Sequence, residues 1–379
     1  MRDGSFTFRR HVRQESKGFV LPPESIVTPS TFRYGYNQSM IELDATNAVD
    51  YLRHVGVLGR DEPATATALG WGVSNVVLRV DSARQSLVLK QSRGQLRTRE
   101  KWFSNLDRIF REAEVMRTLH DLLPTGVVPA VVFEDRDNFA FAMSAAPANH
   151  VVWKQALLAG QVDLEIGRQA GRILGTIHAA TVGCPELARQ FDDIEVFVQL
   201  RVEPFYWRLR NKHPECIGQI DRIADEMFCT RIALTHADFS PKNLLIHDAG
   251  ITLVDYETGH WGDPAFDLGF FLSHLILKSI KHDSIRDRFF QLTRVFWDSY
   301  REQIRPAVAR EEALSLDDLT RRAIDHFALC MLARIDGTSP VDYLPEEPKR
   351  QAVRRLSTDL LESGIGCWET ALAEVADSL

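Results

Sequence analysis

The fold of this 379-residue chain is decided by two segments, Thr235-His236-Ala237-Asp238-Phe239-Ser240-Pro241-Lys242-Asn243 and Asp255-Tyr256-Glu257. In the first segment, Asp238 and Asn243 keep the spacing H-x-D-x-x-x-x-N. In loops of this pattern a carboxylate positions an attacking hydroxyl group and an amide oxygen binds a metal ion. We interpret His236 as a structural anchor of the same loop. The segment therefore indicates phosphoryl transfer with Asp238 as the catalytic residue.

The residues between these segments predict a β-hairpin. Two short apolar runs, Asn243–Ile246 and Ile251–Val254, lie on either side of a Gly-containing turn, which is the signature of a hairpin. A hairpin of this length returns Asp255 to the neighbourhood of Asp238, and Asn243 then adds a third oxygen-bearing side chain. Mg²⁺ prefers oxygen ligands and takes few of them from the protein, so this cluster suits a metal–nucleotide complex.

Composition places the chain among ordinary globular proteins. Apolar residues make up 45% and charged residues 26% of the sequence, which is a typical soluble profile. The length allows two lobes, each with its own core. A net charge of −7 argues against nucleic acid as the general partner. The five cysteines are scattered without a C-x-x-C pair, so we expect reduced thiols rather than disulfides or a zinc site.

No segment predicts secretion or membrane insertion. Residues 1–20 are polar and Arg-rich without an apolar core, unlike a secretory signal. Residues 270–280 are the most apolar stretch, but polar residues interrupt them and they are too short to span a bilayer. We therefore expect a cytoplasmic protein with no membrane partner. The oligomeric state stays open, with a homodimer as one alternative.

The predicted secondary structure changes character along the chain. Residues 1–42 contain several prolines and little periodicity, which predicts an extended N-terminal arm. Residues 43–146 alternate like strands around one or two helices, and residues 147–379 are mostly helical. We predict an α+β fold with a β-rich N-terminal lobe and a mainly helical C-terminal lobe. The predicted helices comprise residues 44–58, 106–119, 163–181, 214–228, 265–282, 284–304 and 316–337.

A glycine-containing turn precedes the predicted strand at residues 76–80. Glycines at such a turn let backbone amides approach phosphate oxygens, because no Cβ is in the way. A plain tight hairpin is the alternative interpretation of this turn taken alone. The residues that we expect to contact the phosphates are Gly70, Gly72, Ser74 and Asn75.

A lysine and a glutamate support the nucleotide-binding prediction. Lys90 lies among apolar residues of the next predicted strand, and a buried lysine requires a partner. Glu112, on the following helix, is the natural one, giving the ion pair that aligns nucleotide phosphates. Glu114 lies roughly 200° around the helix from Glu112, so both cannot face Lys90.

Further residues have structural interpretations. Asp267 precedes a helical run, which predicts a helix N-cap and an anchor for the catalytic loop. His178 is interpreted as a core or loop-anchoring histidine. Lys242 either contacts the γ-phosphate or is solvated. The acidic pairs Asp192-Asp193 and Glu311-Glu312 give only weak support for a cationic acceptor, because solvated acidic faces are common.

Several local stretches extend the pattern set by the catalytic loop. Together they resemble the aminoglycoside phosphotransferase and choline kinase superfamily of small-molecule kinases, and most of all methylthioribose kinase. The resemblance covers roughly Leu43 to Leu361. The stretches that carry it are Val88-Leu89-Lys90-Gln91, Asn149-His150-Val151-Val152-Trp153-Lys154, Asp255-Tyr256-Glu257, Gly262–Gly269 and Cys330–Gly337.

The resemblance implies a bilobal protein-kinase-like fold that uses ATP and Mg²⁺ to phosphorylate a hydroxyl group of a small-molecule acceptor. Lys90 would contact the α and β phosphates, and Asp238 would be the catalytic base. Asp255 and Glu257 would hold Mg²⁺ as a D-x-E pair, with Asn243 as a further ligand.

The resemblance also assigns the adenine and acceptor sites. A hinge from Met143 to Ala146, including Ala145, would recognise adenine through its backbone groups. Arg334 matches an arginine that the family places near the sugar and the transferred phosphate.

The chain departs from methylthioribose kinases on the acceptor side. Their catalytic loop contains Gly-Thr where this chain has Ser240–Asn243, and their second C-terminal arginine is Ala333 here. Trp71 is also unusual in the glycine-containing turn. The acceptor alternatives are a methylthioribose-like sugar, an amino alcohol or an aminoglycoside antibiotic. A catalytically silent nucleotide-binding scaffold is the non-enzymatic alternative, and D-Y-E in place of D-F-G argues against a protein kinase.

Overall fold

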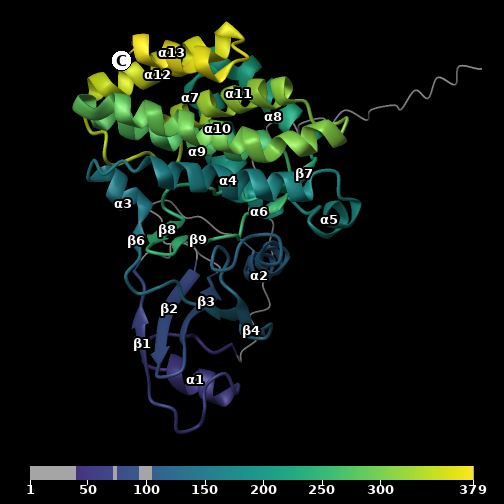
Figure 1. The fold of residues 1–379 in the computed structure, drawn as a ribbon, viewed down its shortest axis with the longest axis vertical. Coiled ribbons are helices and arrows are strands. Elements are labelled where there is room, and N and C mark those ends of the chain that lie inside the picture. Colours follow the sequence, from purple (N-terminus) through teal and green to yellow (C-terminus); the bar gives the residue numbers. More distant parts are fainter. Residues whose placement is uncertain (1–39, 71–74, 94–104, 379) are drawn as a thin grey trace, which may run out of the picture. The chain divides into compact units, whose positions relative to one another are not determined.

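The computed structural model describes residues 40–70, 75–93 and 105–378, drawn as coloured ribbon in Figure 1. Met1–Met40 and Ile41–Leu379 form separate units, and the helices and strands that the structure describes belong to the second. The expected N-terminal arm at residues 1–42 lies almost entirely outside the described residues. Within the described ranges, no helix is long and apolar enough to cross a membrane.

In its described residues, the N-terminal part is an antiparallel sheet with two helices, and its strands follow the order β1-β2-β3-β5-β4. The elements are α1 (Ala48–His54), β1 (Ala64–Ala68), β2 (Asn75–Ser82), β3 (Ser86–Ser92), α2 (Arg108–His120), β4 (Val131–Asp135) and β5 (Ala140–Ser144).

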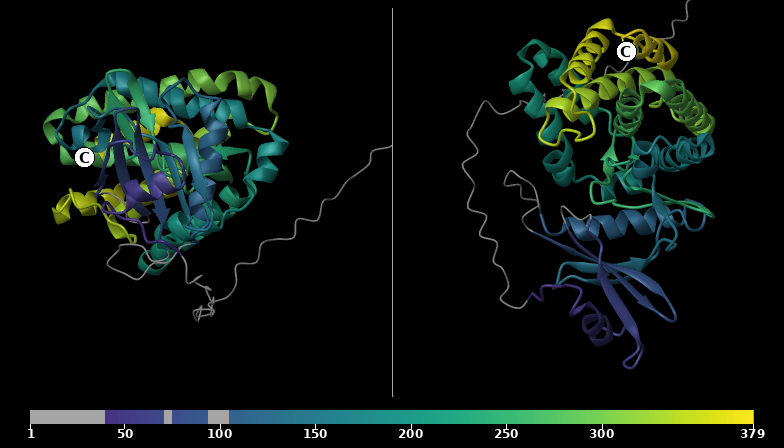
Figure 2. Two further views of the ribbon diagram at one scale, coloured as in Figure 1. Left: turned by 90° about the horizontal axis from the view of Figure 1, so that it is seen from below. Right: turned by 90° about the vertical axis from the view of Figure 1, so that its left-hand side faces the viewer.

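Strand alternation decides which way the lysine of β3 points. Successive side chains of a strand face opposite sides of the sheet. Leu87 and Leu89 pack in the apolar cluster around α1, whereas Val88 packs in the cluster that contains α2. Figure 2 shows these two helices on opposite sides of the sheet. Lys90 is in phase with Val88, so it points toward α2.

The C-terminal part is built mainly from long helices. They are α4 (Leu164–Thr181), α8 (Ile217–Cys229), α9 (Pro264–Lys281), α10 (Arg286–Arg310), α11 (Leu316–Asp336), α12 (Glu347–Ser363) and α13 (Trp368–Ser378). Gly167, Gly171 and Gly175 lie four residues apart along α4, and a Cβ at each would overlap atoms of α10. This glycine stripe allows the two helices to pack closely, as they lie in Figure 1. The expected change from strands to helices is thus confirmed.

Two small sheets hold the catalytic segment between them. β7 (Ala233–Thr235) pairs with β10 (His260–Gly262), and β6 (Val151–Val152), β8 (Leu244–His247) and β9 (Gly250–Leu253) form the second sheet. β8 and β9 are the predicted hairpin, so that prediction is confirmed. The loop between β7 and β8 carries Asp238, and Asp255 follows β9.

A π-helix, η1 (Val198–Trp207), is an element that the sequence pattern did not predict. It contains Pro204, which lacks the N–H group that continues a regular ladder. π-Helical turns are rare and frequently occur at functional sites. The remaining short helices are α3 (Trp153–Leu158), α5 (Pro185–Gln190), α6 (Glu195–Phe197), α7 (Arg208–Lys212), η2 (Pro214–Cys216) and η3 (Asp283–Ile285).

The predicted lobe boundary near residue 146 stays a prediction. The apolar cluster around α2 continues without a break into the helical part, where Val88, Ile109 and Phe141 belong to the same cluster as Phe239 and Leu253. β1 was also missed by the sequence analysis, because its Ala-Thr-Ala-Thr-Ala sequence has little apolar contrast.

Candidate active site

The catalytic loop is anchored through its backbone to α9. The N–H groups of His236 and Ala237 donate to the two carboxylate oxygens of Asp267, at 2.8 and 2.7 Å. Ala237 has a φ of 57°, so the chain turns sharply just before Asp238. The prediction that Asp267 anchors the loop is confirmed. Its predicted role as helix N-cap is wrong: Asp263 caps α9 by accepting from the N–H of Ala265 at 2.9 Å.

The buried histidine His178 forms a hydrogen bond with Asp267. His178 Nε2 lies 3.2 Å from Asp267 Oδ2, and its Nδ1 lies 3.0 Å from the Tyr300 hydroxyl. Burial by itself raises the pKa of Asp267, but its hydrogen bond with His178, the nearby imidazoles of His178 and His236 and the backbone N–H of His236 bring the pKa below its usual value. The carboxylate therefore stays ionised and can accept from the loop backbone. The loop-anchoring interpretation of His178 is confirmed.

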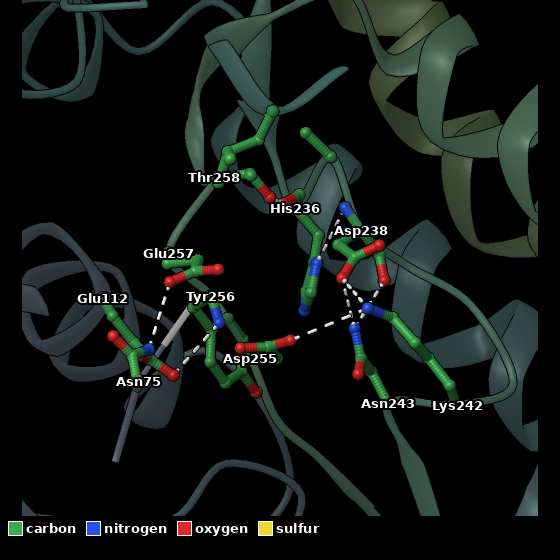
Figure 3. Close-up of polar contacts among 12 residues, drawn as sticks. Asn75, Glu112, His236, Asp238, Lys242, Asn243, Asp255, Tyr256, Glu257 and Thr258 are labelled. Atoms are coloured by element: carbon green, nitrogen blue, oxygen red, sulfur yellow. Dashed lines mark hydrogen bonds and ion pairs between the residues drawn. The ribbon is translucent and has the colours of Figure 1, made fainter. Parts of the chain in front are cut away.

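Asp238 is a buried carboxylate held by three donors. Lys242 Nζ and Asn243 Nδ2 both lie 2.8 Å from its Oδ2 atom, and Arg201 Nη2 lies 2.6 Å from Oδ1. Figure 3 shows Lys242 reaching both Asp238 and Asp255. His236 Nδ1 accepts from the N–H of Asp238 at 3.2 Å, which fits its predicted structural role. The arrangement fixes the direction in which the carboxylate of Asp238 points.

Arg201 is a site residue that the sequence analysis missed. It lies on η1, where its Nε donates to the carbonyl of Ala237 at 2.8 Å and its Nη2 binds Asp238. A single guanidinium group thus holds both the backbone and the side chain of the catalytic loop. The available signal was an arginine in a mostly apolar run, Val198–Trp207; no spacing rule connects that run to Asp238.

Asp255 links the catalytic loop to the N-terminal sheet. Its Oδ1 atom lies 3.4 Å from Lys90 Nζ, and its Oδ2 atom lies 3.9 Å from Lys242 Nζ. Burial raises the pKa of this carboxyl, but Lys90 and then Lys242 outweigh that effect and lower the pKa to about 2. Asp255 is therefore an anion at neutral pH. Its φ of 73° turns the chain immediately after the hairpin.

The predicted lysine–glutamate pair forms. Lys90 Nζ lies 2.6 Å from Glu112 Oε1, and the two side chains are 7% and 0% exposed. The prediction that Glu112, and not Glu114, contacts Lys90 is thus confirmed. Burial alone lowers the pKa of Lys90, yet the nearby charge of Glu112, followed by that of Asp255, raises it above its usual value. Glu112 Oε1 also accepts from the N–H of Tyr256 at 3.3 Å, which ties α2 to the Asp255 segment.

Glu257 binds protein donors. Its Oε2 atom lies 3.1 Å from Asn75 Nδ2 and 3.2 Å from Arg108 Nε. Arg108 Nη2 also donates to Asn75 Oδ1 at 3.2 Å, so these three side chains form a buried network that the sequence analysis did not predict. The phosphate contact expected of Asn75 stays a prediction.

The predicted metal ligands do not form a complete metal site by themselves. In the described part of the chain, no three His, Cys, Asp or Glu side chains lie together as metal ligands do. Mg²⁺ commonly takes one or two carboxylates and completes its coordination with substrate phosphates, so this finding is compatible with a metal–nucleotide complex. Asn243 uses its Nδ2 atom to donate to Asp238, which leaves its amide oxygen as the group that can bind metal.

The structure describes only some of the other residues that were predicted to contact the nucleotide. Gly72, Ser74 and Trp71 lie outside the described residues, and Gly70 borders that gap. Met143 pairs with Val88 within the sheet. The N–H of Ala145 donates to the carbonyl of Ser86 at 2.9 Å, so an adenine contact at Ala145 would have to use its carbonyl.

Arg334 lies on α11, and Asp238 and Arg201 are among the groups whose charges act on it. Its Nη1 atom donates to Ser339 Oγ at 3.3 Å. Its Nε atom is buried and has no hydrogen-bond partner among the described residues. Burial lowers the pKa of this guanidinium from its usual value. The predicted substrate arginine is therefore within the electrostatic influence of Asp238 and retains donor capacity.

The class of protein follows from a family match. Residues 65–307 match the model of the phosphotransferase enzyme family, which is more than half of the chain. The chain belongs to this family and is a small-molecule kinase, a phosphotransferase with a hydroxyl group as acceptor.

Individual relatives add detail. The chain is 24% identical over 292 residues to a methylthioribose kinase of Exiguobacterium sibiricum, covering 70% of this chain and 74% of the relative. It is 23% identical over 355 residues to a methylthioribose kinase of Bacillus pumilus, covering 82% and 88%. The crystal structure of choline kinase from Cryptosporidium parvum superposes with a TM-score of 0.51 at 12% identity, covering 88% of this chain and 95% of that one. That likeness confirms the protein-kinase-like fold class.

Proposed function

We propose that this kinase transfers the γ-phosphoryl group of ATP, with Mg²⁺, to a hydroxyl group of a small sugar-like metabolite. One observation carries the proposal: Asp255 lies 3.4 Å from Lys90 and 3.9 Å from Lys242, which itself lies 2.8 Å from Asp238. A continuous line of charged groups therefore runs from the nucleotide-side lysine to the proposed base.

Each residue in that line has a separate task. Lys90, oriented by Glu112, binds phosphate oxygens on the nucleotide. Asp238 accepts the proton of the acceptor hydroxyl and orients its oxygen; general bases of this kind typically contribute about 10²–10⁴-fold to the rate. Lys242 lies between Asp238 and Asp255 and offsets negative charge that develops on the transferred group.

The side chains fit a Mg-ATP complex. Asp255 is ionised and Asn243 retains an amide oxygen, which are the hard oxygen ligands that Mg²⁺ selects. Glu257 would be the third protein ligand of Mg²⁺. Bound Mg-ATP supplies the phosphoryl group, whose bond to the ADP oxygen breaks as the acceptor oxygen forms its bond to phosphorus.

Two observations support a sugar-like acceptor over other hydroxyl compounds. The two relatives from Exiguobacterium sibiricum and Bacillus pumilus carry the name methylthioribose kinase, and the charge of Asp238 acts on Arg334, the arginine that this resemblance places near the sugar. Ala333 stands where the family has a second arginine, so the acceptor need not be methylthioribose itself.

The test is an ADP-release assay of the full chain with Mg-ATP. The acceptor panel contains methylthioribose, free pentoses, amino alcohols and aminoglycosides, and the Asp238→Asn variant is the matched control. We expect turnover with at least one sugar-like acceptor, a loss of about 10²–10⁴-fold in Asp238→Asn, and no activity in EDTA. Full turnover by Asp238→Asn would show that Asp238 is not the base. If only aminoglycosides were phosphorylated, the acceptor would be an antibiotic and not a sugar-like metabolite.

A further inference from the structure

Basic side chains from four segments lie close enough to His274 of α9 for their charges to act on it. Lys242 lies in the catalytic loop, Lys154 is the second residue of α3, Lys278 lies on α9 and Arg334 lies on α11. We call these four residues the cation cluster. They come from four separate segments, so their convergence is a property of the tertiary structure.

One face of α9 leads from the catalytic loop into the cluster. Phe270, His274 and Lys278 are spaced four residues apart and therefore share a helix face that extends about 12 Å. The guanidinium of Arg201, which binds Asp238, lies 5.7 Å from the Phe270 ring, and that ring lies 4.8 Å from His274. Lys278 thus lies on the same side of the helix as the catalytic aspartate.

Lys278 is buried without a counter-ion. It is 1% exposed, and its Nζ atom donates to the carbonyl of His274 at 2.9 Å and lies 5.3 Å from the ring of Tyr343. No carboxylate pairs with it in the part of the chain that the structure describes. An unpaired buried amine avoids the cost of desolvating its charge by losing its proton, whereas a bound anion would favour the charged form of Lys278.

Other groups of the cluster also have unused hydrogen-bonding capacity. The Nε atom of Arg334 and the hydroxyl of Tyr343 are both buried without a hydrogen-bond partner among the described residues. The half-buried Lys154 lies beside the catalytic loop, because its N–H donates to the carbonyl of Pro241 at 2.8 Å. The buried donors of Arg334 and Tyr343 and the ammonium group of Lys154 therefore add hydrogen-bonding capacity around Lys278.

The charges of the cluster act on one another. Burial lowers the pKa of Lys278, and the charges of Lys154 and Arg334 lower it further. Burial likewise lowers the pKa of Lys154, with Arg334 and Lys242 adding to the effect and the carboxylate of Asp342 opposing it. His274 is affected in the same direction by burial and by all four cations. An anion placed among these groups would relieve the repulsion.

We propose that the acceptor of this kinase carries an anionic group, a carboxylate or a phosphate, which Lys278, Arg334 and Lys154 bind while the acceptor hydroxyl reaches Asp238. This inference rests on the proposed function. It selects among acceptor classes, because the ammonium groups of an amino alcohol or an aminoglycoside would be repelled at this position. Lys278 and Arg334 would be specificity residues rather than catalytic ones.

The test compares acceptors that differ in charge. The pairs are glycerate and glycerol, gluconate and glucitol, and ribose 5-phosphate and ribose; the first two pairs probe a carboxylate and the third a phosphate. We expect the anionic member of at least one pair to have a kcat/KM at least about 100-fold above that of its neutral partner, equivalent to about 2.7 kcal/mol. Turnover of neutral or amine acceptors without such a preference would overturn the inference and leave the proposed kinase function intact.

Variants of single residues test whether the preference for anionic acceptors depends on the cation cluster. Lys278→Met keeps the length and apolar stem of the side chain and removes its charge. It should raise the KM of the anionic acceptor at least about tenfold with little change in the KM of ATP. Lys281→Met is the matched control on the same helix and should behave like wild type. Equal effects of Lys278→Met on both members of a pair would show that Lys278 is a structural lysine.

If no compound of the panel is phosphorylated, a measurement of anion binding tests the inference instead. Thermal unfolding is followed with Mg²⁺ and a non-hydrolysable ATP analogue at saturation, so that added anions cannot act at the nucleotide site. We expect the anionic compounds to raise the Tm of wild type and of Lys281→Met but not of Lys278→Met or Arg334→Met. The absence of any anion-specific shift would overturn the inference. Failure of the ATP analogue itself to shift the Tm would instead contradict the proposed function.

Discussion

Arg201 and Asp238 form a direct ion pair, with Nη2 and Oδ1 2.6 Å apart. The same guanidinium donates to the carbonyl of Ala237 at 2.8 Å. The proposed base is therefore held from two sides: η1 binds it through Arg201, and α9 binds the preceding backbone through Asp267. The contacts of Asp267 are buried and those of Arg201 are partly buried, so the loop is held in one orientation before the reaction.

Replacement of Arg201 should reduce turnover more than binding. Arg201→Met removes both contacts, while Lys242 and Asn243 continue to hold Asp238 in a less defined position. We expect kcat to fall about 10- to 100-fold, since small errors of alignment at a reacting centre have effects of this size, with the KM of ATP nearly unchanged. Arg201→Lys should recover only part of the rate, because an ammonium group cannot reproduce the planar fork of a guanidinium. A proportional rise in both KM values would contradict a positioning role.

Loss of Lys90 should affect both nucleotide use and stability. Lys90→Met leaves Glu112 buried and uncompensated, a situation that typically costs about 3–5 kcal/mol. The double variant Lys90→Met/Glu112→Gln should recover much of the free energy of unfolding, because the introduced glutamine amide can still accept from the N–H of Tyr256. Its kcat/KM for ATP should stay about 100-fold or more below wild type. Urea unfolding measures the first effect and ATP titration the second. Recovery of activity in the double variant would refute the role assigned to Lys90.

The glycine stripe of α4 gives a packing test. A Cβ at Gly171 would overlap the carbonyl oxygen of Phe296 on α10, so Gly171→Ala should destabilise the protein by about 1–3 kcal/mol through overpacking. A Cβ at Gly218 on α8 would meet no atom within 4 Å, and Gly218→Ala should be neutral or slightly stabilising, since alanine favours helix. Urea unfolding of the two variants compares them directly. Equal effects would mean that α4 and α10 are not closely packed.

The buried histidine His260 should make stability depend on pH. Burial lowers its pKa to about 4, and its ring stacks on Phe197 with centroids 4.1 Å apart. An unfolded histidine has a pKa of about 6.5, so between these values the unfolded chain binds a proton that the folded chain does not. The free energy of unfolding should therefore be maintained above about pH 6.5 and fall toward pH 4, by up to about 1.4 kcal/mol per pH unit for this group.

The variant His260→Asn isolates that contribution. The asparagine amide can replace Nδ1, which lies 3.0 Å from the carbonyl of Thr258, but it does not titrate. Urea unfolding at pH 7.5, 6 and 5 gives the free energy of unfolding as a function of pH. For His260→Asn this free energy should fall less steeply toward low pH than for wild type, by an amount that corresponds to the uptake of about one proton. Identical slopes would mean that His260 is not the titrating group.

Local patterns predicted a large part of the structure. The hairpin at β8 and β9 and the pairing of Lys90 with Glu112 were both predicted, because turn chemistry and helix geometry act over a few residues. β1 was missed, since its alternating Ala and Thr residues carry almost no apolar signal. η1 was missed because its irregular hydrogen bonding leaves no periodic pattern.

The amino-acid sequence is sufficient to predict phosphoryl transfer. The spacing from His236 to Asn243 and the order of Lys90, Glu112 and Asp255 along the chain are typical of that chemistry. Which charged residues from distant parts of the chain come into contact depends on the tertiary packing. Arg201 reaches Asp238 from η1, and Lys278 and Arg334 converge because α9 and α11 pack so closely at Gly269 that a Cβ there would overlap the backbone of Phe327. Spacing rules describe neighbours along the chain, whereas the acceptor site depends on how separate helices pack.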